Sequence, residues 1–274
     1  MSEKLGPAFN RLFSASVISN LSDGLLAVAA PLLAISLTKD PILISMLSAF
    51  VMLPWLLFAI PIGLIVDRSD KRLLVTMTNS IRFITAGLVA LAISTDTITI
   101  YWLLLATFLI GTCEVATDTA AQSLIPVILD KKNFEKANSR MNIAETVIQN
   151  FIGAPLSGFL YATSIVLPFI LNSIGFLIAA IFVFMIPAHL ISQGPSGETP
   201  VTENKSFISE IQFGLNYLWN DRPLRRIVAT TSSMGFFFSL ATSTLILFIT
   251  ETLNVQAKYF VSENLVQLRH EIEA

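Results

Sequence analysis

The sequence predicts an all-α integral membrane protein, a six-helix bundle followed by a seventh transmembrane helix. Of its 274 residues, 54% are hydrophobic and only 13% are charged, about half the charged fraction of a soluble domain. Its mean hydropathy is +0.71. Seven apolar segments approach or exceed the roughly 20 residues that a spanning helix needs. The net charge of −2 and the scattered Lys and Arg residues argue against a nucleic-acid partner.

The seven predicted spans follow one another in the chain with mostly short connections. They cover residues 12–37, 41–66, 73–95, 99–124, 143–162, 165–187 and 224–251. The first is longer than the apolar core of a cleavable signal peptide, which has about 7–15 residues, so we expect it to stay in the membrane. The predicted regions are the bundle (1–187), a cytoplasmic linker (188–223), the seventh span (224–252) and a polar tail (253–274).

Basic residues are concentrated in the amino-terminus and in every second connection between the predicted spans. The connections after spans 1, 3 and 5 carry Lys39 alone. Cytoplasmic loops of membrane proteins are enriched in Lys and Arg, so the amino-terminus and the even-numbered loops are predicted to be cytoplasmic. The basic residues on this side are Lys4, Arg11, Arg68, Lys71, Arg72, Lys131, Lys132, Lys136, Arg140, Lys205, Arg222, Arg225 and Arg226.

The connection before span 7 is the longest inside the chain. It opens with SQGPSGETPVTENK, whose Ser, Gly, Pro and Thr residues are typical of a flexible linker. Apolar residues then recur at helical spacing over 207–218, up to Pro223. This pattern predicts a short amphipathic helix at the cytoplasmic membrane surface.

Charged residues inside the spans are candidates for function, because they are costly in a bilayer and usually face a bundle interior or a wet cavity. Asp23 lies in span 1, one turn after Asn20. It is interpreted either as a protonatable or substrate-facing carboxylate or as a helix-packing residue. Arg82 in span 3 can reach the cytoplasmic surface or form an ion pair, which we favour, with the partner left open.

Span 4 carries a second group of acids. Glu114 and Asp118 are four residues apart and share one helix face, which Gln122 extends. Two carboxylates one turn apart repel each other, so one is expected to hold a proton, as proton coupling or cation binding requires. The alternative is a salt bridge to Arg82 or a polar seam between helices. Glu145 in span 5 is interpreted as a partner of Arg140 or of lipid headgroups.

The sequence offers no candidate for an enzyme site, and no catalytic residue, cofactor or metal is predicted. Cys113 is the only cysteine, and His189 and His270 lie far from any partner at ligand spacing. No nucleotide-binding, nucleophile or zinc motif is present. Three alternatives stay open: a transporter, a membrane interaction or assembly protein without transport activity, and a membrane enzyme, against which the isolated histidines argue.

The stretch GLIVDRSDKR between spans 2 and 3 resembles the signature loop of the major facilitator superfamily, usually G-x-L-A-D-R-x-G-R-R or R-K. The matching residues are Gly63, Asp67, Arg68, Lys71 and Arg72. Asp70 stands where glycine is usual, and Val66 where alanine is usual. The resemblance implies that Asp67 and Arg68 help to latch alternating states of a transporter; the alternative is a charge cluster that only fixes topology.

A second element in span 5 looks like a degraded G-P-x-x-G-G motif of exporters in this superfamily. It comprises Gly153, Pro155 and Gly158, with Ala154 inserted and Ser157 in place of a glycine. Gly and Pro at these positions are expected to allow a helix bend and a close helix approach.

Further stretches are similar to the enterobactin-exporter and macrolide-efflux branch. They are NRLFSASVISNLSDGLLAVAAPLLAISLTKDP, QSLIPVILDKKNFEKANS and EIQFGLNYLWNDRPLRRI. The resemblance covers residues 5–260 and implies an inner-membrane exporter of small molecules (drug, macrolide or siderophore-like), driven by protons and built from two six-helix halves.

The chain as given corresponds to the first half plus span 7 of such an exporter. We therefore expect a truncated form that does not transport alone, or one that a separately encoded second half completes. Substrate accumulation in vesicles by the 274-residue chain would contradict the first expectation.

Overall fold

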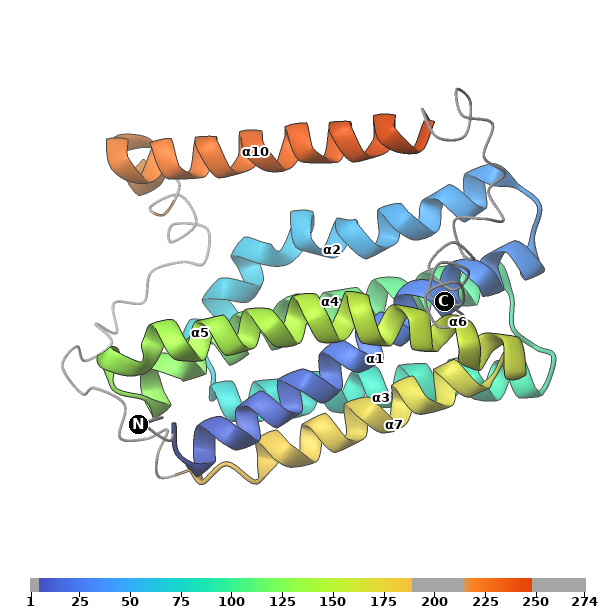
Figure 1. The fold of residues 1–274 in the computed structure, drawn as a ribbon, viewed down its shortest axis with the longest axis horizontal. Helices are drawn as coiled ribbons and strands as arrows, with labels where there is room; N and C mark the ends of the chain where they lie inside the picture. Colours follow the sequence, from blue (N-terminus) through green and yellow to red (C-terminus); the bar gives the residue numbers. More distant parts are fainter. Residues whose placement is uncertain (1–4, 189–213, 215, 248–274) are drawn as a thin grey trace, which may run out of the picture. The chain divides into compact units, whose positions relative to one another are not determined.

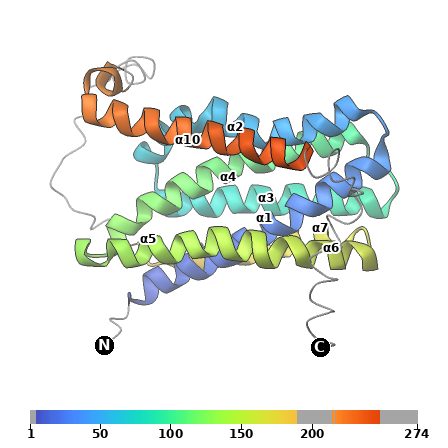
Figure 2. The same cartoon turned by 45° about the horizontal axis from the view of Figure 1, so that its top comes forward.

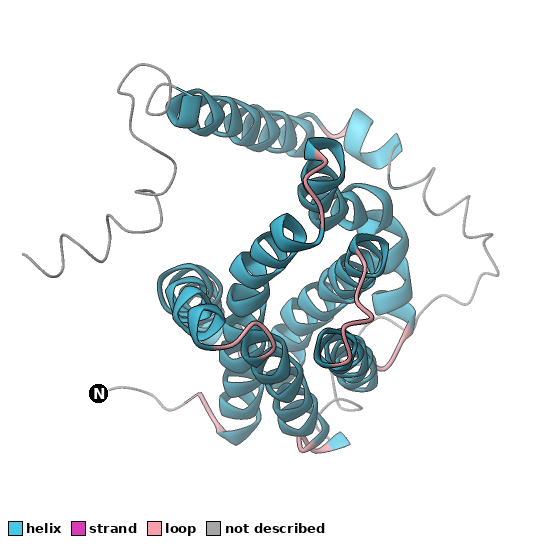
Figure 3. Ribbon diagram, turned by 90° about the vertical axis from the view of Figure 1, so that its right-hand side faces the viewer, coloured by secondary structure: helices cyan, strands magenta, loops and turns pink. Residues whose placement is uncertain are grey.

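The computed structural model describes residues 5–188, 214 and 216–247, and every regular element among them is a helix. Figure 3 shows the helices between residues 7 and 184 joined by short loops. Five of them are long and apolar enough to cross a membrane. They are α1 (Pro7–Leu37), α2 (Pro41–Arg68), α3 (Lys71–Ser94), α4 (Ile100–Ile128) and α7 (Leu167–Phe184). Their bounds agree with predicted spans 1–4 and 6 to within five residues.

The predicted fifth span is a continuous helical rod made of three segments. It comprises α5 (Phe134–Ile143), the π-helix η2 (Ala144–Gly153) and α6 (Ala154–Thr163), after the 3₁₀ turn η1 (Lys131–Asn133). The rod begins before the predicted start at residue 143, because polar residues 134–142 are helical as well. Pro155 lies in the first turn of α6 and has no N–H to donate, so regular α-helical bonding cannot continue through it.

The helices pack around α1, which contacts α7, η2, α6 and α4 (Figure 1). Helix α3 packs between α4 and α7, and α2 packs mainly against α4. Figure 2 shows the same bundle turned, with α1 lying against α7. Helix α2 leaves most of its apolar surface exposed, as a helix does when lipid or another protein surface covers it.

Of the three apolar clusters in the described residues, the two larger ones occupy the two ends of this bundle. One includes Leu12, Val75 and Leu124, and the other includes Leu33 and Leu103. Between them, at the middle of α1, α3 and α4, lies a belt of buried polar side chains. The belt contains Ser19, Ser22, Thr78, Asn79, Arg82, Thr85, Thr107 and Thr117.

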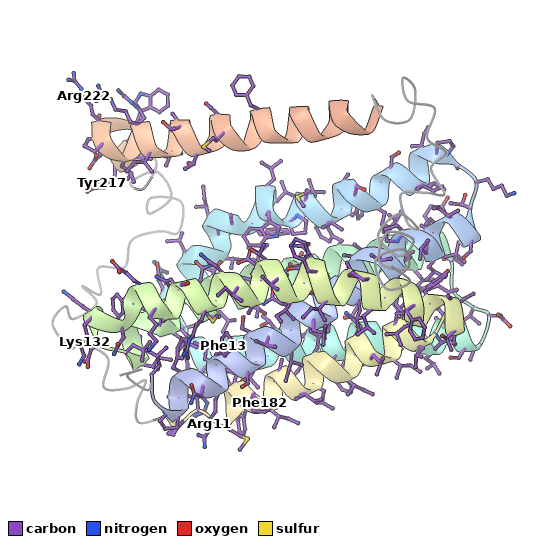
Figure 4. All side chains as sticks on the ribbon, viewed as in Figure 1. Arg11, Phe13, Lys132, Phe182, Tyr217 and Arg222 are labelled. Carbon is purple, nitrogen blue, oxygen red and sulfur yellow. The ribbon has the colours of Figure 1, made fainter. Side chains whose placement is uncertain are left out.

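Basic side chains gather at one end of the bundle. Arg11 at the start of α1 and Lys132 in η1 both lie there (Figure 4). Arg11 Nη1 donates to the Met185 carbonyl at 2.5 Å, which ties the start of α1 to the end of α7. The α2–α3 connection, with Lys71 and Arg72, lies at this end too, whereas Lys39 follows α1 at the opposite end. Within the bundle, basic residues of the amino-terminus and of the even-numbered loops thus share one end; that this end is cytoplasmic stays a prediction.

Residues 203–274 form a separate unit, so the division falls inside the predicted linker. Most of the predicted amphipathic helix and the whole tail lie outside the described residues; 214 and 216–220 are helical. Asp221 then accepts from the Leu224 N–H at 3.0 Å and caps α10 (Arg222–Leu247), so Pro223 lies in the first turn of the next helix. Helix α10 is not among the five candidate spans in the described part of the chain, and the seventh span stays a prediction.

Candidate functional site

The centre of the polar belt is Arg82 of α3, whose side chain is 0% exposed. Its guanidinium donates to Ser19 Oγ at 3.0 Å and forms an ion pair with Asp23, both from α1. The same group lies over the Phe176 ring of α7, 3.9 Å from the ring centroid. Arg82 therefore joins three helices through one charge, instead of reaching the membrane surface.

Further hydrogen bonds hold the helices around this pair. Asn172 of α7 donates to the Ser22 carbonyl at 2.6 Å, and Ser157 of α6 donates to the Leu25 carbonyl at 2.6 Å. The hydroxyls of Thr78 and Thr117 are 2.8 Å apart and connect α3 with α4. The donors from α6 and α7 thus satisfy carbonyls of α1 on both sides of Asp23, and these bonds fix the position of the Asp23 carboxylate.

A cavity of about 300 Å³ lies on one side of the pair. We call it the polar cavity, because amides, hydroxyls and carboxylates from α1, α3, α4, α5 and η2 line much of it. Its polar lining residues are Ser16, Ser19, Asn20, Asn79, Thr117, Asp118, Gln122, Asn138, Asn142 and Glu145. Asp118 and Gln122 come from successive turns of α4, and Glu145 from the π-helix lies exposed at the rim.

A cavity of about 310 Å³ lies on the other side. We call it the apolar cavity, since aliphatic residues of α1, α2 and α4 form most of its wall. These include Leu26, Leu47, Val51, Met52 and Ile110. Its charged residues are Asp23 and Glu114, and its neutral polar residues are Ser48, Thr107 and Gln149.

The two cavities follow one another along the same helices. In α1 the polar cavity uses residues 12–20 and the apolar cavity 23–31. In α4 the corresponding residues are 117–122 and 107–114. Asp118 lines the polar cavity, and Asp23 and Glu114 line the apolar cavity, on neighbouring turns of α1 and α4. We call this region, where the two linings adjoin, the junction. The structure therefore divides the four predicted site residues into two pairs, Asp23 with Glu114 and Asp118 with Gln122.

Charge at this junction is predominantly negative. Asp118 interacts electrostatically with Glu114, Glu145 and Arg82. Among the residues that line the two cavities, none is a Lys or Arg. The site can thus hold protons or a cationic group. Within the described residues, no group of three His, Cys, Asp or Glu side chains could hold a metal ion.

Residues 12–265 match the Major Facilitator Superfamily. The chain belongs to this superfamily. It is a multi-pass membrane protein of the major facilitator type, and the matched range is close to the 5–260 expected from the sequence. No match was found among curated proteins or among solved structures. The narrower enterobactin-exporter and macrolide-efflux branch therefore stays a prediction.

The major facilitator signature stretch is mostly helical. Gly63, Asp67 and Arg68 lie in the last turns of α2, and only Ser69 and Asp70 separate this helix from α3. The carboxylate of Asp70, which replaces the usual glycine, accepts from the Leu73 N–H at 3.1 Å and caps α3.

The other matching positions begin α3. Lys71 is its first residue, and the Arg72 guanidinium lies 5.0 Å from the centroid of the Phe184 ring at the end of α7. Asp67 is exposed and forms no ion pair within the described part of the bundle. The stretch thus connects α2, α3 and α7 at the basic end.

The exporter-like element of span 5 divides into two parts. Gly153 ends the π-helix and lies against α1, where a Cβ would stand 2.9 Å from Gly24 Cα. Gly158 has open space around its Cα. The close helix approach that the sequence led us to expect is present at Gly153, and Pro155 is the second residue of α6, after Ala154. That the element bends the helix stays a prediction.

Sequence reasoning missed Asn79 and Phe176. Asn79 lies three residues before Arg82 and so shares its helix face, a spacing that could have revealed it. Phe176 carried no signal, because one phenylalanine in a Phe-rich span looks like any lipid-facing residue.

Proposed function

We propose that the described bundle is one half of a proton-coupled exporter of small molecules such as drugs, macrolides or siderophores. The supporting observation is the Asp23–Arg82 ion pair at the junction of two cavities that also carry Glu114 and Asp118. Protons and substrate compete for these carboxylates, which is what antiport requires. Gln122 takes part as a neutral hydrogen-bonding group on the same wall.

The Asp23–Arg82 pair supplies a two-state element for this exchange. A proton on Asp23 leaves Arg82 buried without its counter-charge, which is costly in a low-dielectric interior. A neighbouring carboxylate such as Glu114, which already interacts with Arg82, lowers this cost. Proton binding thus favours a different arrangement of α1 against α3 and α4, as a ligand does when it binds one conformation better.

The signature stretch is proposed as the conformational latch. Asp67 and Arg68 end α2, and α2 presents an exposed apolar surface to its surroundings. In the twelve-helix arrangement of the superfamily, this surface would meet the second half, which we propose as a partner for the described bundle. Movement of α2 would then change the surroundings of the latch.

The membrane is proposed to be a bacterial inner membrane, with the amino-terminus in the cytoplasm. The basic end of the bundle supports this orientation, because Lys and Arg mark cytoplasmic loops. Bilayer lipids surround the bundle. The proposed branch, enterobactin-exporter and macrolide-efflux, rests on the sequence stretches quoted above.

The experiment measures ligand binding and proton release together. The purified 274-residue chain in lipid nanodiscs, in weak buffer with a pH indicator, is titrated with tetraphenylphosphonium, erythromycin or enterobactin. We expect at least one of them to bind, to release protons and to bind more tightly as the pH rises. Because binding is measured, the test needs no complete transport cycle.

Substitutions identify the carboxylate that exchanges the proton. Asp23→Asn, Glu114→Gln and Asp118→Asn each remove one carboxylate, and the residue that exchanges protons is the one whose variant loses proton release. Asp96→Asn is the matched control, since Asp96 lies in the exposed turn after α3 with φ 53°, a conformation that Asn tolerates. Binding without proton release in the unmodified chain would refute proton coupling, and no binding of any probe would refute the substrate class.

A further inference from the structure

The polar cavity contains a buried acceptor that none of the described residues satisfies. Asn79 is 1% exposed, and its Nδ2 donates to the Val75 carbonyl at 3.0 Å. Its Oδ1 has no hydrogen-bond partner among the described residues, although the residue lines the cavity. A buried carbonyl oxygen without a donor is costly, so a ligand donor placed here gains more than it would in water.

The charged groups of the same cavity are acceptors as well. Asp118 and Glu145 contribute carboxylates, and the guanidinium of Arg82, which interacts electrostatically with Asp118, is engaged by Asp23 and Ser19. A ligand in this cavity therefore meets acceptors with negative charge and no cation. This favours a positively charged hydrogen-bond donor and disfavours a carboxylate or phosphate.

The apolar cavity lies one helical turn further along α1 and α4, on the other side of the junction, and most of its walls are aliphatic. Together the two cavities, about 300 and 310 Å³, fall in the range of drug-sized ligand sites. A ligand that fills both must carry its polar, donor-bearing end on the Asn79 side and its apolar body on the Val51 side.

We propose that the two cavities bind one amphiphilic amine, with its N–H-bearing ammonium group between Asn79 and Asp118 and its apolar body in the apolar cavity. The inference rests on the proposed function and narrows its substrate class. Asn79 would then determine specificity, because its oxygen distinguishes an ammonium with N–H groups from a quaternary ammonium of the same charge.

Matched fluorescent probes test this on the purified full chain in nanodiscs. Dansylcadaverine has an apolar naphthalene body and a primary ammonium. Its N-trimethyl analogue keeps the charge without N–H groups, its N-acetyl analogue loses the charge, and dansyl-aminohexanoate carries a carboxylate instead. We expect the amine to bind about five- to tenfold more tightly than the trimethyl and acetyl analogues, and the carboxylate to bind more weakly than all three.

Variants test whether Asn79 and Asp118 cause the preference for the amine. Asn79→Leu should bring the amine and its trimethyl analogue to equal affinity. Asp118→Asn should weaken both cations and leave the acetyl analogue unchanged. Asn150→Leu is the matched control, because Asn150 is exposed and lines neither cavity, so every affinity should be retained. Circular dichroism shows whether each variant is folded. If a variant does not fold, the affinities of the four probes for the unmodified chain still test the inference.

The outcomes separate the inference from the proposed function. Equal affinity for amine and trimethyl analogue in the unmodified chain, or a preference that survives Asn79→Leu, overturns the inference. So does tight binding of the carboxylate probe. If tetraphenylphosphonium binds with proton release while dansylcadaverine does not bind, the inference fails and the proposed function stands.

Discussion

Gly24 of α1 and Gly153 of η2 meet backbone to backbone: a Cβ added to either would stand 2.9 Å from the Cα of the other. A Cβ on Gly153 would also approach the Leu21 carbonyl oxygen at 2.9 Å. Backbone atoms cannot move aside as a flexible side chain can. This crossing sets the separation of α1 from η2, and with it the position of Asp23 relative to Gln149.

Gly153→Ala should therefore destabilise the bundle. Overpacking of this kind costs about 1–3 kcal/mol, although Ala alone would favour the helix by roughly 0.5–1 kcal/mol. The matched control is Gly158→Ala, since Gly158 has nothing near its Cα. Thermal unfolding in detergent, followed by circular dichroism, should show a lower Tm for the first variant and an unchanged or higher Tm for the second; the reverse order would contradict the close crossing.

Because Asp23 and Arg82 form a buried ion pair, we expect substitutions of the two residues to have non-additive effects on the free energy of unfolding. Arg82→Met or Asp23→Leu alone leaves one buried charge unpaired, which costs about 3–5 kcal/mol. The double variant removes both charges and should be more stable than either single one. Unfolding free energies of the four proteins give the coupling. Lys39→Met, at an exposed position, is the control for removing a cation; additive effects at Arg82 and Asp23 would show that the pair is not coupled.

Because Asp70 caps α3, we expect substitutions at this position to destabilise the protein to different degrees. Asp70→Ala loses the bond to the Leu73 N–H and should cost about 0.5–2 kcal/mol, whereas Asp70→Gly, the residue usual in the superfamily, should cost only a few tenths. Asp70→Asn should be nearly neutral. The Tm values should follow this order. An alanine variant as stable as the natural protein would mean that the cap is dispensable.

Single cysteines test the orientation in the membrane. Cys113 is buried, so in the unmodified background Lys39→Cys and Lys131→Cys, both at exposed positions, are the accessible thiols. With the amino-terminus in the cytoplasm, a membrane-impermeant maleimide should label the first in intact cells and the second only after the membrane is opened. The opposite pattern would invert the proposed topology.

Hydropathy predicted the helices well, because a bilayer imposes one length and one composition on each span. The positions of Asp23, Arg82, Glu114 and Asp118 inside the protein also followed from the cost of charge in lipid. The partners of these residues could not be predicted in this way. Asp23 and Arg82 are 59 residues apart, and no local sequence pattern encodes which helices are in contact. The π-helix and the unsatisfied Asn79 oxygen depend on packing in three dimensions, which a single sequence does not display.

The polar belt also constrains how the protein enters the membrane. Helix α1 carries Asp23 and is synthesised before α3, which carries Arg82. Each charge alone adds roughly 2.5–3.5 kcal/mol to insertion at a helix centre, and pairing offsets part of this. The first helix is thus released into lipid most favourably once the third has emerged, so the insertion machinery must shelter α1 during synthesis of the intervening chain.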